Sequence, residues 1–209
     1  MRERKTPSKF IIATGVFLLA ACSDGGPMAP ARPTMPAKGA GAIVSAVTAG
    51  DTSITVLSVN AWAKQTASFD MGTFKLVIPA NAICSLATSS YGPTEWDQPC
   101  VPEAGTVTIT VRTWTDASGH ARTDFQPHMR FNPAAEPVIL TLKDKAGVQP
   151  GAVIVYCADL ASSCVDESLT DPSLVTSRDP NNGNFYRRVK HFSGYAVASG
   201  FSTDSTVAE

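Results

Sequence analysis

Short runs in which apolar and polar residues alternate are the clearest structural signal along the chain. In segment 106–111 threonine alternates with valine or isoleucine, which is typical of an antiparallel strand with one buried face. Segment 74–78 is a more apolar run that ends at a proline, as strands often do. The same criteria predict strands at 53–59, 137–142, 152–156 and 185–198.

The sequence has no sustained helical period with capping residues. Short strands separated by Pro, Gly, Asn and Asp favour an antiparallel β-sandwich over alternating strands and helices, so the fold class predicted for residues 42–201 is all-β. Segment 158–184 is mostly polar and contains a strong turn signal at 179–184. We therefore expect it to form an extended surface loop.

The two flanks of this domain have a different composition. Segment 25–41 holds four prolines and four glycines and almost no large apolar residue, so residues 22–41 are predicted to be a flexible tether. Residues 202–209 are predicted to be a polar tail.

The first 21 residues follow the order of a secretory signal peptide. Residues 1–9 carry four basic side chains, and residues 10–21 are apolar and uncharged. This core of 12 residues is shorter than the ~20 needed to span a bilayer. It therefore predicts an export signal.

The end of that core, Leu19-Ala20-Ala21-Cys22, resembles a bacterial lipobox. The resemblance implies cleavage before Cys22, lipid attachment to its sulfur and a lipid-anchored position in the cell envelope. Ser23 after the cysteine favours the outer membrane or cell surface over the inner membrane. Ordinary secretion, with Cys22 incidental, is the alternative.

Charge gives no indication of nucleic-acid binding. Loss of the leader removes four of 17 basic residues and one of 18 acidic ones, and leaves 13 and 17 over 188 residues. The chain without its leader is therefore slightly acidic, and its sequence shows no basic patch of the kind that binds nucleic acid. No cofactor motif is present, and the oligomeric state is left open.

Four further cysteines, an even number, favour disulfides in an exported protein. Of three connectivities, Cys84–Cys100 and Cys157–Cys164 are preferred, because each pair brackets a loop-like stretch between predicted strands. Metal binding is the alternative, but no Cys-x-x-Cys pair supports it.

Three stretches together resemble a ZU5 domain. They are residues 72–83, with Asn81 where the family usually has glycine, residues 131–142, and His191-Phe192-Ser193 near the end. Asn tolerates a left-handed backbone well, so the turn at Asn81 is expected to persist. The resemblance covers 68–200 and implies a β-sandwich that acts as an interaction or structural unit.

In some ZU5 and related domains the tripeptide His-Phe-Ser breaks its own chain between Phe and Ser. The resemblance implies that Ser193 is the nucleophile, that His191 is its base or orients it, and that Phe192 precedes the scissile bond. A regular strand separates residues 191 and 193 by ~6.6 Å, so the reaction needs a kink, which Gly194 could allow.

The alternative interpretation is structural. Phe192 would lie on one face of a last strand, with Val189, Tyr195 and Val197 on the other, and His191 would be satisfied or half-exposed. We therefore interpret the domain first as a non-catalytic module that binds an unidentified protein or glycan or supports the envelope, and second as a single-turnover self-cleaving domain.

Other candidates are weaker. Arg187, Arg188 and Lys190 are interpreted as a solvated strand edge. The tryptophans could stack on sugars, although packing is the simpler explanation; they are Trp62, Trp96 and Trp114. The sequence Asp116-Ala-Ser-Gly119 is typical of a hairpin turn. The spacing of the nearby acidic and histidine residues does not match a metal site; they are Asp116, His120, Asp124 and His128.

Overall fold

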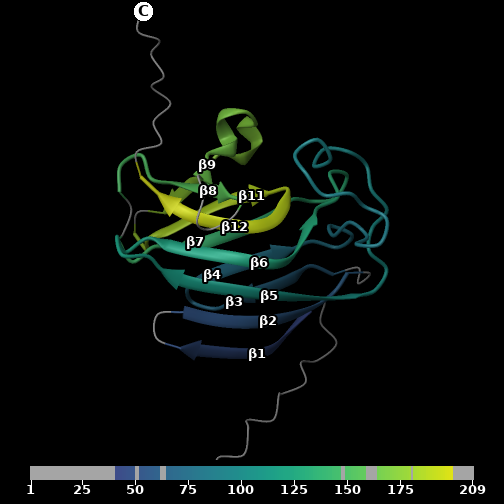
Figure 1. Cartoon of the computed structure of the whole chain (residues 1–209), viewed down its shortest axis with the longest axis horizontal. Helices are drawn as coiled ribbons and strands as arrows, with labels where there is room; N and C mark the ends of the chain where they lie inside the picture. Colours follow the sequence, from purple (N-terminus) through teal and green to yellow (C-terminus); the bar gives the residue numbers. More distant parts are fainter. Residues whose placement is uncertain are drawn as a thin grey trace, which may run out of the picture. The chain divides into compact units, whose positions relative to one another are not determined.

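The computed structural model describes residues 41–49, 52–61, 65–146, 149–158, 164–179 and 181–199. They form two antiparallel sheets packed as a sandwich (Figure 1), and the predicted all-β class is confirmed. The predicted leader, Cys22, nearly all of the tether and the polar tail lie outside the described residues.

One sheet has the strand order β1-β2-β5-β6-β12-β8-β9 and the other has the order β10-β11-β7-β4-β3. The strands are β1 (Gly41–Ala49), β2 (Thr52–Asn60), β3 (Ala67–Asp70), β4 (Phe74–Ile78), β5 (Thr106–Thr115), β6 (Ala121–Arg130), β7 (Val138–Lys143), β8 (Val153–Cys157), β9 (Cys164–Val165), β10 (Ser177–Asp179), β11 (Asn184–Val189) and β12 (His191–Ala198).

The run predicted as one strand over 185–198 is two strands in different sheets. β11 pairs with β7, whereas β12 pairs with β6 and β8, and the chain crosses between the sheets at Lys190. β11 alternates buried and exposed residues, but seven of the eight residues of β12 are buried. Strands covered on both faces are apolar throughout. The apolar residues of β12 therefore follow those of β11 without a break, and the sequence gives no sign that the chain changes sheets.

Segment 158–184 is not the extended surface loop that its polarity predicted. Its described part contains β9, two 3₁₀ helices, η1 (Glu167–Leu169) and η2 (Pro172–Leu174), and β10. Asp166 and Asp171 cap the helices through their side chains. Glu167 and Leu174 are buried, so polar residues here serve as caps and internal partners.

The core lies between the two sheets and is built from the inward positions of alternating strands. Its largest members include Phe125, Phe185 and Phe192, none of which is exposed. Phe125 contacts Phe74 of the opposite sheet edge to face, with ring centroids 6.2 Å apart. Aromatic packing therefore joins the sheets directly behind β12.

Both predicted disulfides are present, Cys84–Cys100 and Cys157–Cys164. Asn81 has φ 58°, which confirms the left-handed turn expected where the ZU5 pattern has glycine. Both bridges lie near the start of β12. Cys157 pairs with Gly194 of β12, and the Cys84 amide donates a hydrogen bond to the carbonyl of Arg130, which pairs with His191 of β12.

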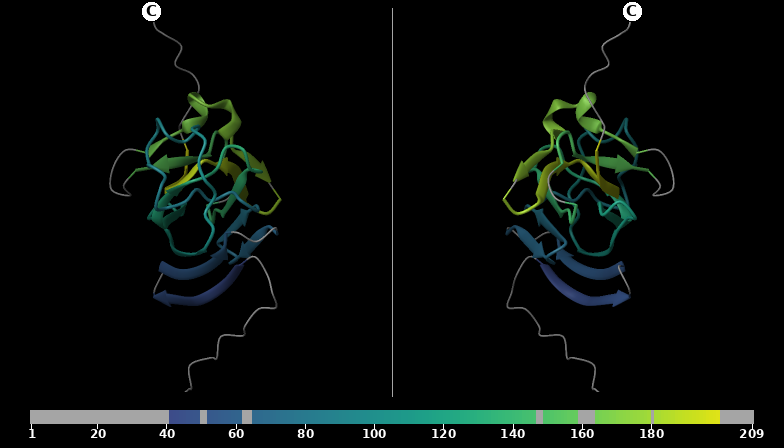
Figure 2. Two further views of the ribbon diagram at one scale, coloured as in Figure 1. Left: turned by 90° about the vertical axis from the view of Figure 1, so that its right-hand side faces the viewer. Right: turned by 90° about the vertical axis from the view of Figure 1, so that its left-hand side faces the viewer.

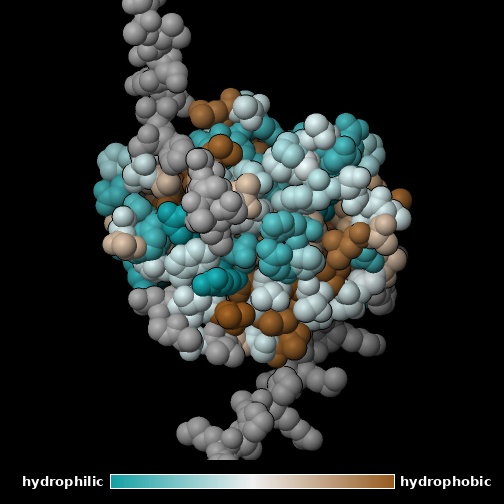
Figure 3. All heavy atoms as spheres, in the orientation of Figure 1, coloured by the Kyte–Doolittle hydropathy of each residue, from teal (hydrophilic) through white to brown (hydrophobic). Residues whose placement is uncertain are grey.

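The strands β1 and β2 form one end of the larger sheet, and the 3₁₀ helices lie at the opposite end (Figure 2). Apolar side chains are visible on the surface near β1 and β2 (Figure 3), where Ile43, Val44 and Ile54 are exposed. Within the described ranges, no helix has the length and apolar character needed to cross a membrane.

Candidate functional site

The His191-Phe192-Ser193 segment lies at an irregularity in the larger sheet. Phe192 pairs with Met129 of β6, but Gly194 pairs with Asp124. Four residues of β6, 125–128, therefore lie opposite Ser193 alone, and the ladder is interrupted at the Phe192–Ser193 bond. The extra residues lie on β6, so the irregularity is a bulge of the strand opposite Ser193, and the kink expected at the Phe192–Ser193 bond of β12 stays a prediction.

The irregularity also changes which face each side chain occupies. Phe192, Tyr195 and Val197 all belong to the main core, whereas Ala196 packs in a separate cluster. The prediction that Phe192 lies opposite Tyr195 and Val197 was wrong, because it assumed unbroken alternation. Phe192 is held by stacking on Phe125 at 4.5 Å and by an edge contact with Phe131 at 4.7 Å.

The Tyr91 hydroxyl reaches this bond from a distant part of the chain. It donates a hydrogen bond of 2.9 Å to the carbonyl oxygen of Phe192, the carbonyl that Ser193 would attack. Tyr91 is 38 % exposed as a whole, but desolvation at its inward-facing hydroxyl raises the pKa of Tyr91 well above its ordinary value, and a hydrogen bond from Ser193 opposes this shift. Tyr91 therefore stays protonated at neutral pH and acts as a donor.

His191 is fully buried and has a partner on each ring nitrogen. Its Nε2 lies 3.0 Å from Oε1 of Glu167, and its Nδ1 lies 3.2 Å from the Tyr91 hydroxyl. A carboxylate can only accept, so we assign the proton to Nε2 and a free lone pair to Nδ1. The nitrogen able to take a proton thus faces Tyr91.

Burial lowers the pKa of His191, although the Glu167 carboxylate opposes that effect. The imidazole is therefore neutral at neutral pH, which is the form a general base needs. The Tyr195 hydroxyl donates to the His191 carbonyl at 2.7 Å and fixes the backbone on the other side of the ring.

Glu167 is itself held by Arg187. The guanidinium Nη2 lies 2.9 Å from Oε2 of Glu167, and its other nitrogens donate to the carbonyls of Ile154 and Arg188. Arg187 is 2 % exposed, so its interpretation as part of a solvated edge was wrong. Arg188 is exposed, but β11 lies between β10 and β7 and is no edge strand. Lys190 is half-buried where the chain crosses between the sheets, and it forms ion pairs with Asp97 and Asp171.

Trp96 covers the outer side of the site. Its ring stacks on His191 with centroids 3.8 Å apart and an interplanar angle of 17°, and the Tyr156 ring approaches His191 edge on at 4.8 Å. Ser193 is 1 % exposed, and its hydroxyl also lies 3.4 Å from the Cys157 carbonyl. The nucleophile, base and scissile carbonyl are therefore shielded from solvent.

The remaining candidates do not assemble a second site. Asp116 accepts hydrogen bonds from the amides of Ser118 and His120 and forms the predicted hairpin turn. In the described part of the chain, no three His, Cys, Asp or Glu side chains gather as a metal ion requires. Trp62 lies outside the described residues.

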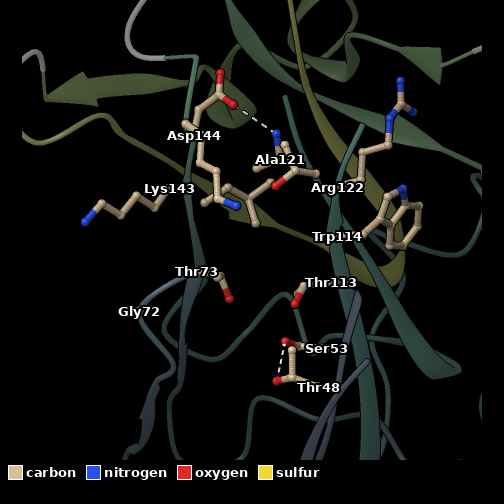
Figure 4. Close-up of a pocket in the computed structure, with 13 residues that line it drawn as sticks. Thr48, Ser53, Gly72, Thr73, Thr113, Trp114, Ala121, Arg122, Lys143 and Asp144 are labelled. Carbon is tan, nitrogen blue, oxygen red and sulfur yellow. Dashed lines mark hydrogen bonds between the residues drawn. The ribbon is translucent and has the colours of Figure 1, made fainter. Parts of the chain in front are cut away.

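A hollow of about 490 Å³ opens at the end of the sandwich remote from Tyr91. Hydroxyl side chains of Thr73 and Thr113 face each other across it, whereas Trp114 and Lys143 point away on opposite sides (Figure 4). Trp114 packs beneath the Arg112 guanidinium at 5.2 Å. Trp114 thus borders the hollow while its indole also packs against Arg112.

Sequence reasoning identified His191, Phe192 and Ser193 but missed Tyr91, Glu167 and Arg187 as their partners. Tyr91 and Glu167 lie 101 and 24 residues from their partners Phe192 and His191. No local pattern could connect them. The one available signal was the Cys84–Cys100 pair, which marks the loop that carries Tyr91.

No protein-family model matches the chain, and no curated protein sequence matches it significantly.

Proposed function

We propose that this chain is an envelope lipoprotein, anchored through Cys22, whose ZU5-like β-sandwich cleaves its own backbone once between Phe192 and Ser193. The observation that carries the proposal is the hydrogen bond from Tyr91 to the Phe192 carbonyl, made where the ladder is interrupted. A side-chain donor on that one carbonyl stabilises the charge that develops there when Ser193 attacks.

In the first step the Ser193 hydroxyl oxygen bonds to the Phe192 carbonyl carbon. The proton that it loses reaches Nδ1 of His191 through the Tyr91 hydroxyl, which contacts both side chains: it takes up the Ser193 proton as it passes its own to Nδ1. Tyr91 stabilises the oxyanion, and Glu167 stabilises the imidazolium through Nε2. The peptide bond between the Phe192 carbonyl carbon and the Ser193 nitrogen then breaks, as the imidazolium returns the proton to that nitrogen. The product is an ester between the Phe192 carbonyl and the Ser193 oxygen.

Water completes the reaction by hydrolysing the ester to a Phe192 carboxylate and a free Ser193 hydroxyl. The new amino terminus stays in place, because residues 194–198 of β12 pair with β8 and residues 194–196 also pair with β6. Tyr195 and Val197 remain buried in the core, and each contributes roughly 1.5–3 kcal/mol of apolar burial. Cleavage would therefore give a two-chain domain that keeps its fold.

The proposal is tested by the mass of the purified full chain under denaturing and native conditions. Wild type is expected to yield a denatured fragment that begins at Ser193, while the native particle keeps both pieces. The Ser193→Ala variant removes the nucleophile and should remain a single chain. A wild-type chain that stays intact with both disulfides formed would support the non-catalytic interaction module instead.

The Cys22→Ala variant should move the protein from the membrane fraction to the soluble fraction. A lipid on Cys22 would supply roughly 0.8 kcal/mol per buried methylene, and two chains are enough for stable anchoring. Immunoblotting of fractionated cells measures the change, with Ser23→Ala as the neighbouring control. A Cys22→Ala protein that remains membrane-bound would contradict the anchor.

A further inference from the structure

The residues that activate the scissile bond come from a loop with no core of its own. Residues 85–99, here called the cystine loop, carry Tyr91 and Trp96 and lie between Cys84 and Cys100. None of residues 85–100 is buried, and none belongs to a strand or helix. The position of this loop therefore depends on a few specific ties.

Three of these ties converge on Arg130, which pairs with His191 across β6 and β12. Its guanidinium donates to the carbonyls of Glu95, Gln98 and Pro99. Arg130 is 5 % exposed, so the second half of the loop is fastened directly beside the cleavage site. The first half, which holds Tyr91, is tied at its start, where the Ser85 amide donates to the Val101 carbonyl and the Leu86 amide donates to Glu103.

The disulfide ties that first half to the second. Cys84 is 1 % exposed and hydrogen-bonded to the Arg130 carbonyl, and its bridge closes a ring with a sequence separation of 16. A ring of this size restricts the open ensemble by an amount that corresponds to about a 100-fold change in equilibrium constant. Loss of the bridge therefore frees chiefly the first half of the loop, which carries Tyr91.

We propose that formation of the Cys84–Cys100 disulfide switches on self-cleavage, by docking Tyr91 on the Phe192 carbonyl. This regulation rests on the proposed function. The two thiols lose two electrons and two protons, and an oxidising disulfide such as oxidised glutathione is reduced to two thiols. The chain would then remain intact in a reducing compartment and be cleaved after export.

The test is a time course on the full chain made by cell-free synthesis with a reductant. After transfer to oxidised glutathione, the Ser193 fragment should appear about 100-fold faster than in reduced glutathione. Thiol labelling with peptide mass spectrometry follows each cysteine pair. The cleavage rate should follow oxidation of Cys84 and Cys100 across a series of glutathione potentials.

Cysteine variants distinguish the effect of the Cys84–Cys100 disulfide from that of the Cys157–Cys164 disulfide. Cys84→Ser/Cys100→Ser should cleave slowly at every potential, whereas Cys157→Ser/Cys164→Ser should keep the response to oxidation. Circular dichroism checks that each is folded; if the first is not, the wild-type potential series decides alone. Equal wild-type rates in both glutathione forms would overturn the switch and leave self-cleavage standing. If the Ser193 fragment does not appear even when both disulfides have formed, that result would instead overturn self-cleavage.

Discussion

The Tyr91→Phe variant is expected to cleave about 10²–10³-fold more slowly than wild type, the usual cost of losing one oxyanion donor. The substitution removes the oxygen that donates to the Phe192 carbonyl at 2.9 Å. It keeps the ring that stacks on His128 at 5.4 Å. The loop should therefore stay docked while the carbonyl loses its donor. The rate is measured from the appearance of the Ser193 fragment after the switch to oxidising conditions.

Tyr186→Phe provides a matched control, because Tyr186 is 43 % exposed on β11 and lies on the other sheet. It should cleave at the wild-type rate. Thermal unfolding of both variants separates a loss of catalysis from a loss of folding. An unchanged rate in Tyr91→Phe would show that the hydrogen bond to Phe192 is structural, and would remove the main support for self-cleavage.

The sequence predicted several strands closely and missed others, among them β1, β3 and β6. β4 begins and ends where its apolar run predicted, and β2, β5, β7 and β8 lie within a few residues of their predictions. β6 was missed because Gln126, Pro127 and His128 interrupt its apolar pattern, and these residues lie where the strand departs from regular pairing. These residues have a low intrinsic preference for a strand, and β6 forms there because it packs between its neighbours β5 and β12.

The candidate site shows the same division. The reacting tripeptide and the two disulfides are local features, since each involves adjacent residues or cysteines that bracket one loop. The environment of His191 arises from long-range contacts that no spacing rule encodes. Glu167 looked like one acidic residue in a polar stretch, yet the fold buries it between Arg187 and His191. Burial converts it from a surface charge into a positioning group.

The Arg187→Met variant is expected to lose about 3–5 kcal/mol of unfolding free energy, because it leaves the Glu167 carboxylate buried without its charged partner. The pair lies at 2.9 Å, and the Arg187 side chain is fully buried. Arg187 also ties β11 of the smaller sheet to the Ile154 carbonyl of β8 in the larger one. Its loss therefore affects both the ion pair and a contact between the sheets.

Urea unfolding at neutral pH, followed by tryptophan fluorescence, measures this loss in a Ser193→Ala background that cannot cleave. Arg188→Met is the matched control, since the neighbouring Arg188 is exposed, and it should lie within about 0.5 kcal/mol of its parent. In the Glu167→Gln/Arg187→Met double variant the buried charges disappear together, while the amide oxygen can still accept from Nε2 of His191. We expect it to be less destabilised than the sum of the two single variants, because each single change leaves one buried charge unpaired. Strictly additive losses would mean that Arg187 and Glu167 do not stabilise each other, and that Glu167 orients His191 without help from the arginine.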